Sequence, residues 1–342
     1  MGNKKYVVAL LILAAAVGAL ILLFQPRVMP PPGGGEAPRP ANSPSLEGWP
    51  RTFTDSLGQT ATFARPVQRV VTMSPNLAEI VCAVGAADCL VGVDDYTAYP
   101  PEAAAKPKIG GIINPNLESV LAVRPEVVLV ARGVDKQVMQ RLQEVGGLQM
   151  LSYDPQTLDQ VLDSIGEIGR LVGKDAEAKR LVASLRARKQ AVQQRVAAAG
   201  EPRPRVMLIV SWDGLYVAGR ESFGNDLIET AGGENVVEKM PGVKTDPWPG
   251  ITRELVVMGD AEVMVFAGEH ALPVAGEEEG ILARLRRDGA WRELSAVKNG
   301  KVLIVDADLV TLPSPRLFEG LEKVAATIAN APTAQEGPGE AR

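Results

Sequence analysis

The sequence predicts an α/β protein of two lobes, each a mostly parallel sheet covered by helices, joined by a single long helix. The main observation is an internal repeat without a gap: Asn116–Ala131 matches Thr252–Ala267, and Arg69–Met73 matches Arg205–Ile209, both 136 positions apart. Each copy reads as a buried strand, a short helix with a glutamate in its first turn, and a second buried strand. One unit used twice indicates two similar lobes with a ligand site between them.

The bulk composition supports a large folded body and excludes two kinds of function. The chain of 342 residues is 46% hydrophobic and 23% charged, which is typical of globular proteins and long enough for two cores. A net charge of −5 gives no basic face for nucleic acid. One histidine and two cysteines do not supply a four-ligand Cys/His zinc site, so we expect no bound metal. Cys82 and Cys89 fit either a disulfide or two small hydrophobic thiols.

The N-terminal residues indicate an extracytoplasmic protein. Residues 6–24 are 19 uncharged, almost wholly apolar positions preceded by Lys4 and Lys5, close to the about 20 that span a bilayer. The run ends in Phe24-Gln25-Pro26, a poor cleavage context, and no cysteine follows it for lipid attachment. Residues 1–25 therefore favour an uncleaved membrane anchor, with a cleaved signal as the alternative, and in both cases we expect the rest of the chain outside the cytoplasm.

Composition also divides the remaining chain. Positions 25–50 hold eight prolines and four glycines, which predicts an extended tether over residues 26–50. The Gly- and Pro-containing residues 332–342 read as a disordered tail. Between these ends we expect an N-terminal lobe (51–173), a linking helix (174–200) and a C-terminal lobe (201–331).

In the first lobe, strand and helix patterns alternate, which predicts a parallel sheet covered by helices. Thr52–Phe63 reads as a small hairpin around a turn. Ser74 supplies a helix cap and Pro75 a first-turn proline for a helix that ends at Gly85. The expected strands are 69–73, 90–93, 126–131 and 148–153, and the further helices are a short one after Asn116 and 137–145.

Helix and strand patterns also define the linking region and the second lobe. Thr157–Val172 is an amphipathic helix, and Asp175–Ala199 is a second helix without proline or glycine, which we expect to act as a stiff strut between the lobes. The second lobe begins with a strand at Arg205 and ends with the strand Val302–Val305 and the helix Arg316–Ala329.

Two sets of residues are candidates for contacts. Glu118 and Glu254 occupy equivalent places in the repeat. Either they lie at helix N-termini only because acids are favoured there, or they form a pair of charged contacts with a partner protein. Aromatic residues follow strands of both lobes, where open α/β sheets bind ligands. These aromatic residues predict either a ligand cleft or packing against the lobe's own core, and they are Tyr96, Trp212, Tyr216 and Trp248.

Catalytic motifs are weak. His270 stands in a Gly-rich acidic loop without a nucleophile motif nearby. The acid pairs Asp94-Asp95 and Asp306/Asp308 follow strands, where such residues more often cap helices or contact a ligand than perform acid–base chemistry. We therefore expect a binding protein without catalytic residues or a resident cofactor, and the rival from another class is an extracytoplasmic α/β enzyme using these acids.

Short motifs in both lobes match one known family. They are Arg69–Pro75, Val91–Tyr96, Tyr99–Glu102 and Ile109–Glu118 in the first lobe, and Tyr216–Gly219, Ala231–Asn235 and Ser314–Arg316 in the second. These motifs resemble the helical-backbone substrate-binding proteins of ABC importers, which carry vitamin B12, ferric siderophores and haem. The resemblance covers about residues 51–330, and the B12-binding proteins look most similar.

The resemblance implies a monomer that delivers its ligand to an importer. It places Glu118 and Glu254 against arginines of a permease dimer. It also implies ligand contacts in the cleft at Tyr96, Tyr216 and Trp248. Four further ligand-contact positions follow from the resemblance, and they are Ser74, Pro75, Ile112 and Asp308. The expected ligand is cobalamin or a related corrinoid, and the alternative is a ferric siderophore or haem.

Departures from the family pattern bear on the ligand. Ile112 and Ala131 stand where some B12 binders have tryptophans, which leaves a flatter aliphatic wall on the first lobe. Tyr96 would suit haem iron. A catecholate siderophore would need clustered arginines, for which the candidates are Arg132, Arg220 and Arg316.

Overall fold

The computed structural model describes residues 47–112, 114–131, 134, 136–200, 202–212, 214–268 and 281–329. These residues all belong to one compact unit, Ser45–Arg342. The predicted anchor, most of the tether, Arg132, His270 and the predicted tail lie outside the described residues. Within the described ranges, no helix is both long enough and apolar enough to cross a membrane.

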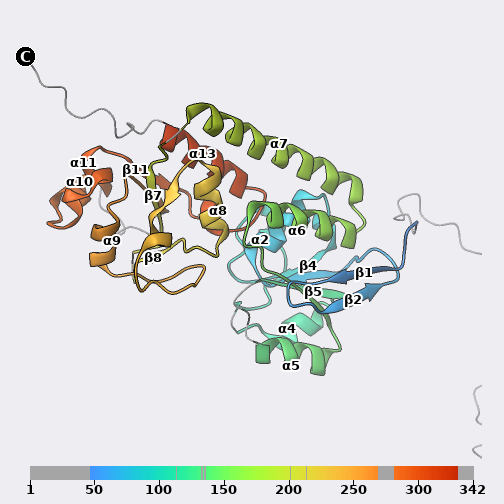
Figure 1. Cartoon of the computed structure of the whole chain (residues 1–342). Helices are drawn as coiled ribbons and strands as arrows, with labels where there is room; N and C mark the ends of the chain where they lie inside the picture. The colour runs from blue at the N-terminus through green and yellow to red at the C-terminus, as the bar shows by residue number, and fades with distance from the viewer. Residues whose placement is uncertain are drawn as a thin grey trace, which may run out of the picture. The chain divides into compact units, whose positions relative to one another are not determined.

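The first lobe is built on a parallel four-stranded sheet in the order β4-β3-β5-β6 (Figure 1). Residues 127–130 of the central strand are fully buried, as expected for a strand covered on both faces. The predicted hairpin is present as an antiparallel pair. The elements are β1 (Arg51–Thr54), β2 (Thr60–Phe63), β3 (Val70–Thr72), α2 (Pro75–Ala83), η1 (Ala87–Cys89), β4 (Leu90–Val93), α3 (Pro101–Ala104), α4 (Leu117–Ala122), β5 (Val127–Ala131), α5 (Lys136–Gly146) and β6 (Gln149–Tyr153).

The second lobe contains a five-stranded sheet in the order β11-β10-β7-β8, with β9 also paired to β7. Its strands are parallel except β8, which runs antiparallel to β7. The elements are β7 (Arg205–Ser211), β8 (Tyr216–Val217), α8 (Phe223–Thr230), β9 (Glu234–Asn235), η2 (Val236–Lys239), α9 (Arg253–Gly259), β10 (Val263–Ala267), α10 (Ile281–Arg287), η4 (Trp291–Glu293), α11 (Ser295–Lys298), β11 (Val302–Val305), α12 (Asp308–Thr311) and α13 (Leu317–Ala329). The predicted fold class is confirmed.

The sequence repeat is also a repeat of structure. The register of β3 against β5 equals that of β7 against β10, since the first pairs are Val70 with Val127 and Val206 with Val263. The turn before the second strand of each pair contains a left-handed residue at the same offset, Arg124 with φ 45° and Asp260 with φ 36°. Equal spacing in both register and turn shows that the two lobes share one scaffold.

Two helices lead from one sheet to the other. α6 (Leu158–Leu171) is followed by α7 (Asp175–Ala199), which has the predicted bounds. α7 packs on α6 near its N-terminal end and on α8 and α13 of the second lobe toward its C-terminal end (Figure 1). The guanidinium of Arg188 on α7 donates to both carboxylate oxygens of Glu322 on α13, at 2.8 and 2.7 Å. The linking helix is therefore attached to both lobes.

The two cysteines are free thiols, so the disulfide left open by the sequence is not formed. Cys82 is half-buried in α2 and Cys89 is buried. Burial, with a smaller contribution from the nearby carboxylate of Glu102, raises the pKa of the Cys82 thiol to about 11. Thiols of this kind stay protonated near neutral pH and act as small hydrophobic side chains.

Close packing of α6 on α7 generates a first prediction. A Cβ at Gly169 would lie 2.2 Å from the Cβ of Ala178, whereas a Cβ at Gly166 meets nothing within 4 Å. Gly169→Ala should therefore lower the free energy of unfolding by about 1–3 kcal/mol through overpacking. Gly166→Ala in the same helix should raise it by up to about 1 kcal/mol, because alanine favours helix. Urea denaturation followed by circular dichroism measures both, and equal effects of the two variants would contradict this account of the α6–α7 contact.

Candidate functional site

A cavity of about 330 Å³ is lined by residues of both lobes. Its size lies within the roughly 300–1,000 Å³ of small-molecule sites. Ser74, Asn76 and Tyr153 line it from the first lobe, and Phe223, Trp248 and Pro313 from the second. Two larger hollows, of about 470 and 510 Å³, lie along α6–α7 and beside the C-terminal end of α7. Neither contains a predicted site residue, so the cavity between the lobes is the candidate site.

Trp248 is held firmly in the wall of this cavity. Its ring centroid lies 5.2 Å from that of Phe223, and the two ring planes are inclined at 66°. The indole also packs closely against the backbone of Gly224, where a Cβ would lie only 2.9 Å from the indole Cη2. The backbone of its loop pairs with the β8 segment, where the Val217 N–H donates to the Pro249 carbonyl at 3.1 Å. The indole is therefore a preorganised apolar surface.

The N-terminal turn of α2 supplies polar groups to the opposite wall. Ser74 is buried at the cap position, but its hydroxyl bonds the Asn76 Oδ1 instead of capping the helix. The Asn76 Nδ2 donates to the Pro313 carbonyl of the second lobe at 3.4 Å. Pro75 is the first helical residue and lies between these two side chains in the chain. This turn therefore combines polar cavity groups with a contact between the lobes.

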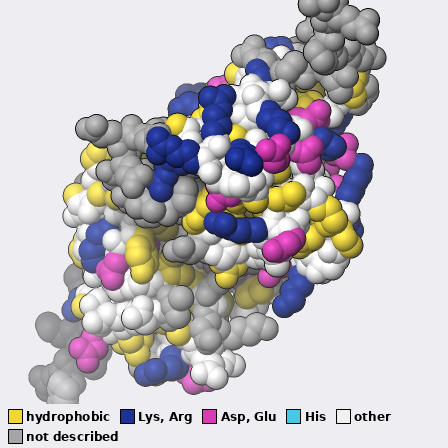
Figure 2. Space-filling view, turned by 90° about the vertical axis from the view of Figure 1, so that its left-hand side faces the viewer, with side chains coloured by type: hydrophobic (Ala, Val, Ile, Leu, Met, Phe, Trp, Pro, Cys, Tyr) yellow, Lys and Arg dark blue, Asp and Glu magenta, His cyan; other side chains and the backbone are white. Residues whose placement is uncertain are grey.

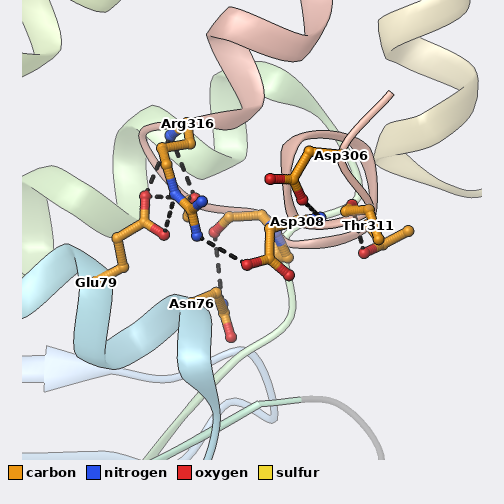
Figure 3. A network of polar contacts seen from close by, with 9 residues as sticks. Asn76, Glu79, Asp306, Asp308, Thr311 and Arg316 are labelled. Atoms are coloured by element: carbon orange, nitrogen blue, oxygen red, sulfur yellow. Dashed lines mark hydrogen bonds and ion pairs between the residues drawn. The ribbon is translucent and has the colours of Figure 1, made fainter. Parts of the chain in front are cut away.

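A buried ion pair joins the lobes beside the cavity (Figure 3). Glu79 on α2 is only 4% exposed, and its carboxylate accepts from the Ser314 hydroxyl at 2.8 Å and from the Arg316 Nε at 2.9 Å. The Arg316 Nη2 reaches the Asp308 carboxylate at 3.1 Å, and its guanidinium lies 4.1 Å from the Tyr99 ring centroid. Although burial opposes its charge, Glu79 and Asp308 hold the pKa of Arg316 above its ordinary value. We call Glu79, Asp308, Ser314 and Arg316 the inter-lobe bridge.

Only Ser74 and Trp248 of the eight predicted ligand contacts line the cavity. Of the other six, Pro75 lies in α2, Asp308 in the inter-lobe bridge and Trp212 against the core of its own lobe, and Tyr96, Ile112 and Tyr216 lie on loops or strands. Tyr96 is 69% exposed and Tyr216 is 48% exposed, whereas Ile112 is partly buried. The loop of Tyr96 is fixed by the fully buried Asp94, whose carboxylate accepts from the Tyr96 N–H at 2.9 Å and the Thr97 hydroxyl at 2.5 Å. Burial raises the pKa of Asp94. Tyr96 is thus an exposed ring on a well-held loop.

Trp212 lies against the core of its own lobe, the alternative that the sequence left open. Its ring centroid is 4.8 Å from that of Trp291 and 6.5 Å from that of Phe266. The guanidinium of Arg253 lies 6.0 Å from the Trp212 centroid. The structure therefore does not bring Trp212 together with Ser74 and Trp248.

Sequence reasoning did not select Glu79 or Phe223. Glu79 is the one charged residue from Pro75 to Val84, where only Asn76 is otherwise polar, and an isolated acid on a buried helix was the signal available. Phe223 follows the helix cap Ser222, whose hydroxyl accepts from the Asn225 N–H. No feature of its local pattern distinguishes it from an ordinary core residue.

Glu118 and Glu254 are exposed in the first turns of α4 and α9. A side-chain oxygen caps each helix. In α4 the Asn116 Oδ1 accepts from the Ser119 N–H, and in α9 the Thr252 Oγ1 accepts from the Leu255 N–H. A hydrogen bond from Thr252 holds the pKa of Glu254 below its ordinary value. Figure 2 views the end of the second lobe that carries α9 to α11, where charged side chains of both signs lie beside hydrophobic ones.

The chain is similar to known proteins in both sequence and fold. A family model described as periplasmic binding protein matches residues 70–309. The chain belongs to this family. An uncharacterized ABC transporter substrate-binding lipoprotein of Bacillus subtilis is 29% identical to this periplasmic binding protein over 289 residues, which cover 82% of this chain and 86% of the relative.

A second relative and a solved structure extend the comparison. A cobalamin-binding protein of Halobacterium salinarum is 28% identical over 298 residues, covering 85% of this chain and 79% of the relative. The crystal structure of the periplasmic vitamin B12-binding protein BtuF of Vibrio cholerae aligns with a TM-score of 0.66 at 23% identity, covering 77% of this chain and 97% of that chain. The structural likeness shows a shared fold.

The inter-lobe bridge generates the second prediction. Arg316→Met should lower the free energy of unfolding by about 3–5 kcal/mol, because it leaves the buried Glu79 carboxylate without its charged partner. Arg188→Met is the matched control, since its pair with Glu322 is about one-third exposed on both sides and should cost no more than about 1 kcal/mol. Denaturation midpoints of both variants measure the difference. If Arg316→Met costs no more than the control, the bridge does not hold the lobes.

Proposed function

We propose that this periplasmic binding protein is the extracytoplasmic substrate-binding component of an ABC importer, and that it carries cobalamin or a related corrinoid. The observation that carries the proposal is the cavity with Trp248 on one wall and the polar turn of Ser74 and Asn76 on the other. Relatives named as cobalamin-binding and as ABC transporter substrate-binding support the same assignment. The ligand leaves unchanged, as expected of a carrier.

The chemistry of the walls suits a corrinoid. A corrinoid presents a flat macrocycle with an apolar face and a rim of amide side chains. The fixed indole of Trp248 offers a surface for the macrocycle. The side-chain donors of Ser74, Asn76 and Thr311 are used within the protein, so their oxygens are the groups that can accept from the ligand's amide N–H groups. A corrinoid exceeds this cavity in size, so its remaining surface requires further contacts, for which the exposed rings of Tyr96 and Tyr216 are the candidates.

Three of the four acids that favoured an enzyme have structural partners, whereas Asp95 is exposed. Asp94 fixes the Tyr96 loop, and Asp308 pairs with Arg316. Asp306 accepts from the Asp308 N–H at 3.1 Å, as helix-capping acids do. Because three of the four carboxylates are engaged in the fold, binding without catalysis is the better proposal.

Glu118 and Glu254 are the proposed contacts with the permease. Both are exposed on equivalent helices of the repeat, so they suit a partner that presents two equivalent basic positions. Anchoring through residues 1–25 and a monomeric state belong to the same proposal, since a tethered monomer reaches an importer in the same membrane.

Ligand titration generates the third prediction. Purified full-length chain should bind cobalamin, measured by calorimetry, in preference to haem and ferric siderophores. Trp248→Ala should weaken binding by about 2–3 kcal/mol, as truncation of a buried aromatic anchor does. Trp212→Phe should leave affinity unchanged, because Trp212 packs on Trp291 away from the cavity. Absence of cobalamin binding, or an unaltered affinity of Trp248→Ala, would refute the assignment of ligand or site.

Charge reversal at the two glutamates generates the fourth prediction. Cells that carry Glu118→Arg with Glu254→Arg should lose cobalamin uptake, because like charges repel the permease arginines. Affinity of the purified variant for cobalamin should equal that of the original chain. Glu221→Arg, at another exposed acid, is the control and should transport normally. A parallel loss of ligand affinity would argue against a docking role.

A further inference from the structure

The first turn of α8 supports the indole of Trp248. Phe223, the first residue of α8, places its ring centroid 5.2 Å from that of Trp248, with the ring planes at 66°. At the next position, a Cβ on Gly224 would lie 2.9 Å from the indole Cη2. Edge-to-face ring pairs of this kind favour one relative orientation of the two rings. A shift of this turn would therefore move the face that the indole presents to the cavity.

Hydrogen bonds also join this turn to the loop of Trp248. The Ser222 hydroxyl, at the cap of α8, donates to the Gly219 carbonyl at 2.7 Å, and the Gly219 N–H donates to the Pro247 carbonyl at 2.9 Å. The approach is close, because a Cβ at Gly219 would lie 2.2 Å from the Asp246 carbonyl oxygen. The Trp248 N–H in turn donates to the Asp246 carboxylate at 3.0 Å. The start of α8 and the tryptophan loop are therefore one connected unit.

The same helix bonds to the first lobe through Asp226, three residues after Phe223. The Asp226 carboxylate accepts from the Leu158 N–H at 2.7 Å. Leu158 is the first residue of α6, and the α6 cap Thr157 bonds the Gln160 N–H instead. A carboxylate at a helix N-terminus gains from a charge-assisted hydrogen bond and from the helix dipole. Asp226 of the second lobe thus completes the N-terminal capping of a first-lobe helix.

Asp226 is separate from the candidate cavity. It does not belong to the cavity lining, and it lines the hollow of about 510 Å³ beside the C-terminal end of α7. Other links between the lobes use different elements, since Arg188 and Glu322 join α7 to α13, and Glu79 bonds residues that precede α13. Among these three links, the one through Asp226 lies on the turn that holds Phe223.

We propose that Asp226 is a positioning residue for the Trp248 wall of the cavity. Its bond to α6 fixes the first turn of α8, and that turn sets the orientation of the indole. This inference rests on the proposed function, in which the indole contacts the macrocycle of a corrinoid. Without the bond, the indole samples further orientations, and a ligand then binds only the fraction of molecules in which the wall is correctly placed.

The test uses the full-length chain, purified in mild detergent and labelled with fluorotryptophan. Trp248→Phe identifies the Trp248 resonance in the fluorine NMR spectrum of the ligand-free chain. Asp226→Ala should shift or broaden this resonance and weaken cobalamin binding about tenfold, measured by calorimetry. Asp226→Asn keeps an oxygen acceptor for the Leu158 N–H, so it should retain most of the original resonance and affinity.

Two controls separate this role from general loosening of the fold. Glu229→Ala removes an exposed acid from the same helix, and Arg188→Met removes an inter-lobe ion pair on other elements. Both should leave the Trp248 resonance and the affinity for cobalamin unchanged. Asp226 is only partly buried, so Asp226→Ala should fold, which thermal unfolding checks. If it does not fold, Asp226→Ser is measured in its place by the same criteria.

The outcomes distinguish this role from the choice of ligand. An unchanged Trp248 resonance in Asp226→Ala overturns the positioning role, whichever ligand the chain carries. An equal change in either control, or a changed resonance with unaltered affinity for cobalamin, overturns it as well. If the original chain does not bind cobalamin, the corrinoid assignment fails, and the resonance of the ligand-free chain still decides the role of Asp226.

Discussion

The buried carboxylate of Glu79 is the constraint on which the arrangement of the site depends. It belongs to α2 of the first lobe, yet its donors, the Ser314 hydroxyl and the Arg316 guanidinium, come from the second lobe. A carboxylate removed from water is costly unless its hydrogen bonds and its charge are satisfied. Separation of the lobes would break this pairing, so the lobes are held in the arrangement that forms the cavity.

The cavity and the inter-lobe bridge share the same short segments. Asn76 lies three residues before Glu79 on α2, and Pro313 directly precedes Ser314. Asn76 and Pro313 both line the cavity and also contact each other. Because the bridge fixes these two segments, it also fixes the position of the polar wall opposite Trp248. The inter-lobe bridge and the candidate site are therefore linked through adjacent residues.

The sequence was sufficient for features that depend on local pattern. The bounds of α7 follow from an unbroken helical stretch, and the matched registers of the two sheets follow from the gapless repeat. Features that depend on distant partners were less accessible. Trp212 follows a strand, as a cleft residue would, but Trp291 and Phe266 surround it in the folded lobe. Glu79 finds its partners 235 and 237 positions later in the chain, and no local pattern indicates such a pairing.

Attachments at several points oppose large movements of one lobe against the other. α7 is bound to the first lobe through the ion pair of Lys189 with Asp159, and to the second through Arg188 and Glu322. The Leu158 N–H at the start of α6 donates to the carboxylate of Asp226 on α8, at 2.7 Å. A wide hinge opening would break this contact and the buried pair of Glu79 together. Under the proposed function, a ligand enters a largely preformed cavity, and we expect its affinity to depend on the fixed geometry of the walls more than on closure around the ligand.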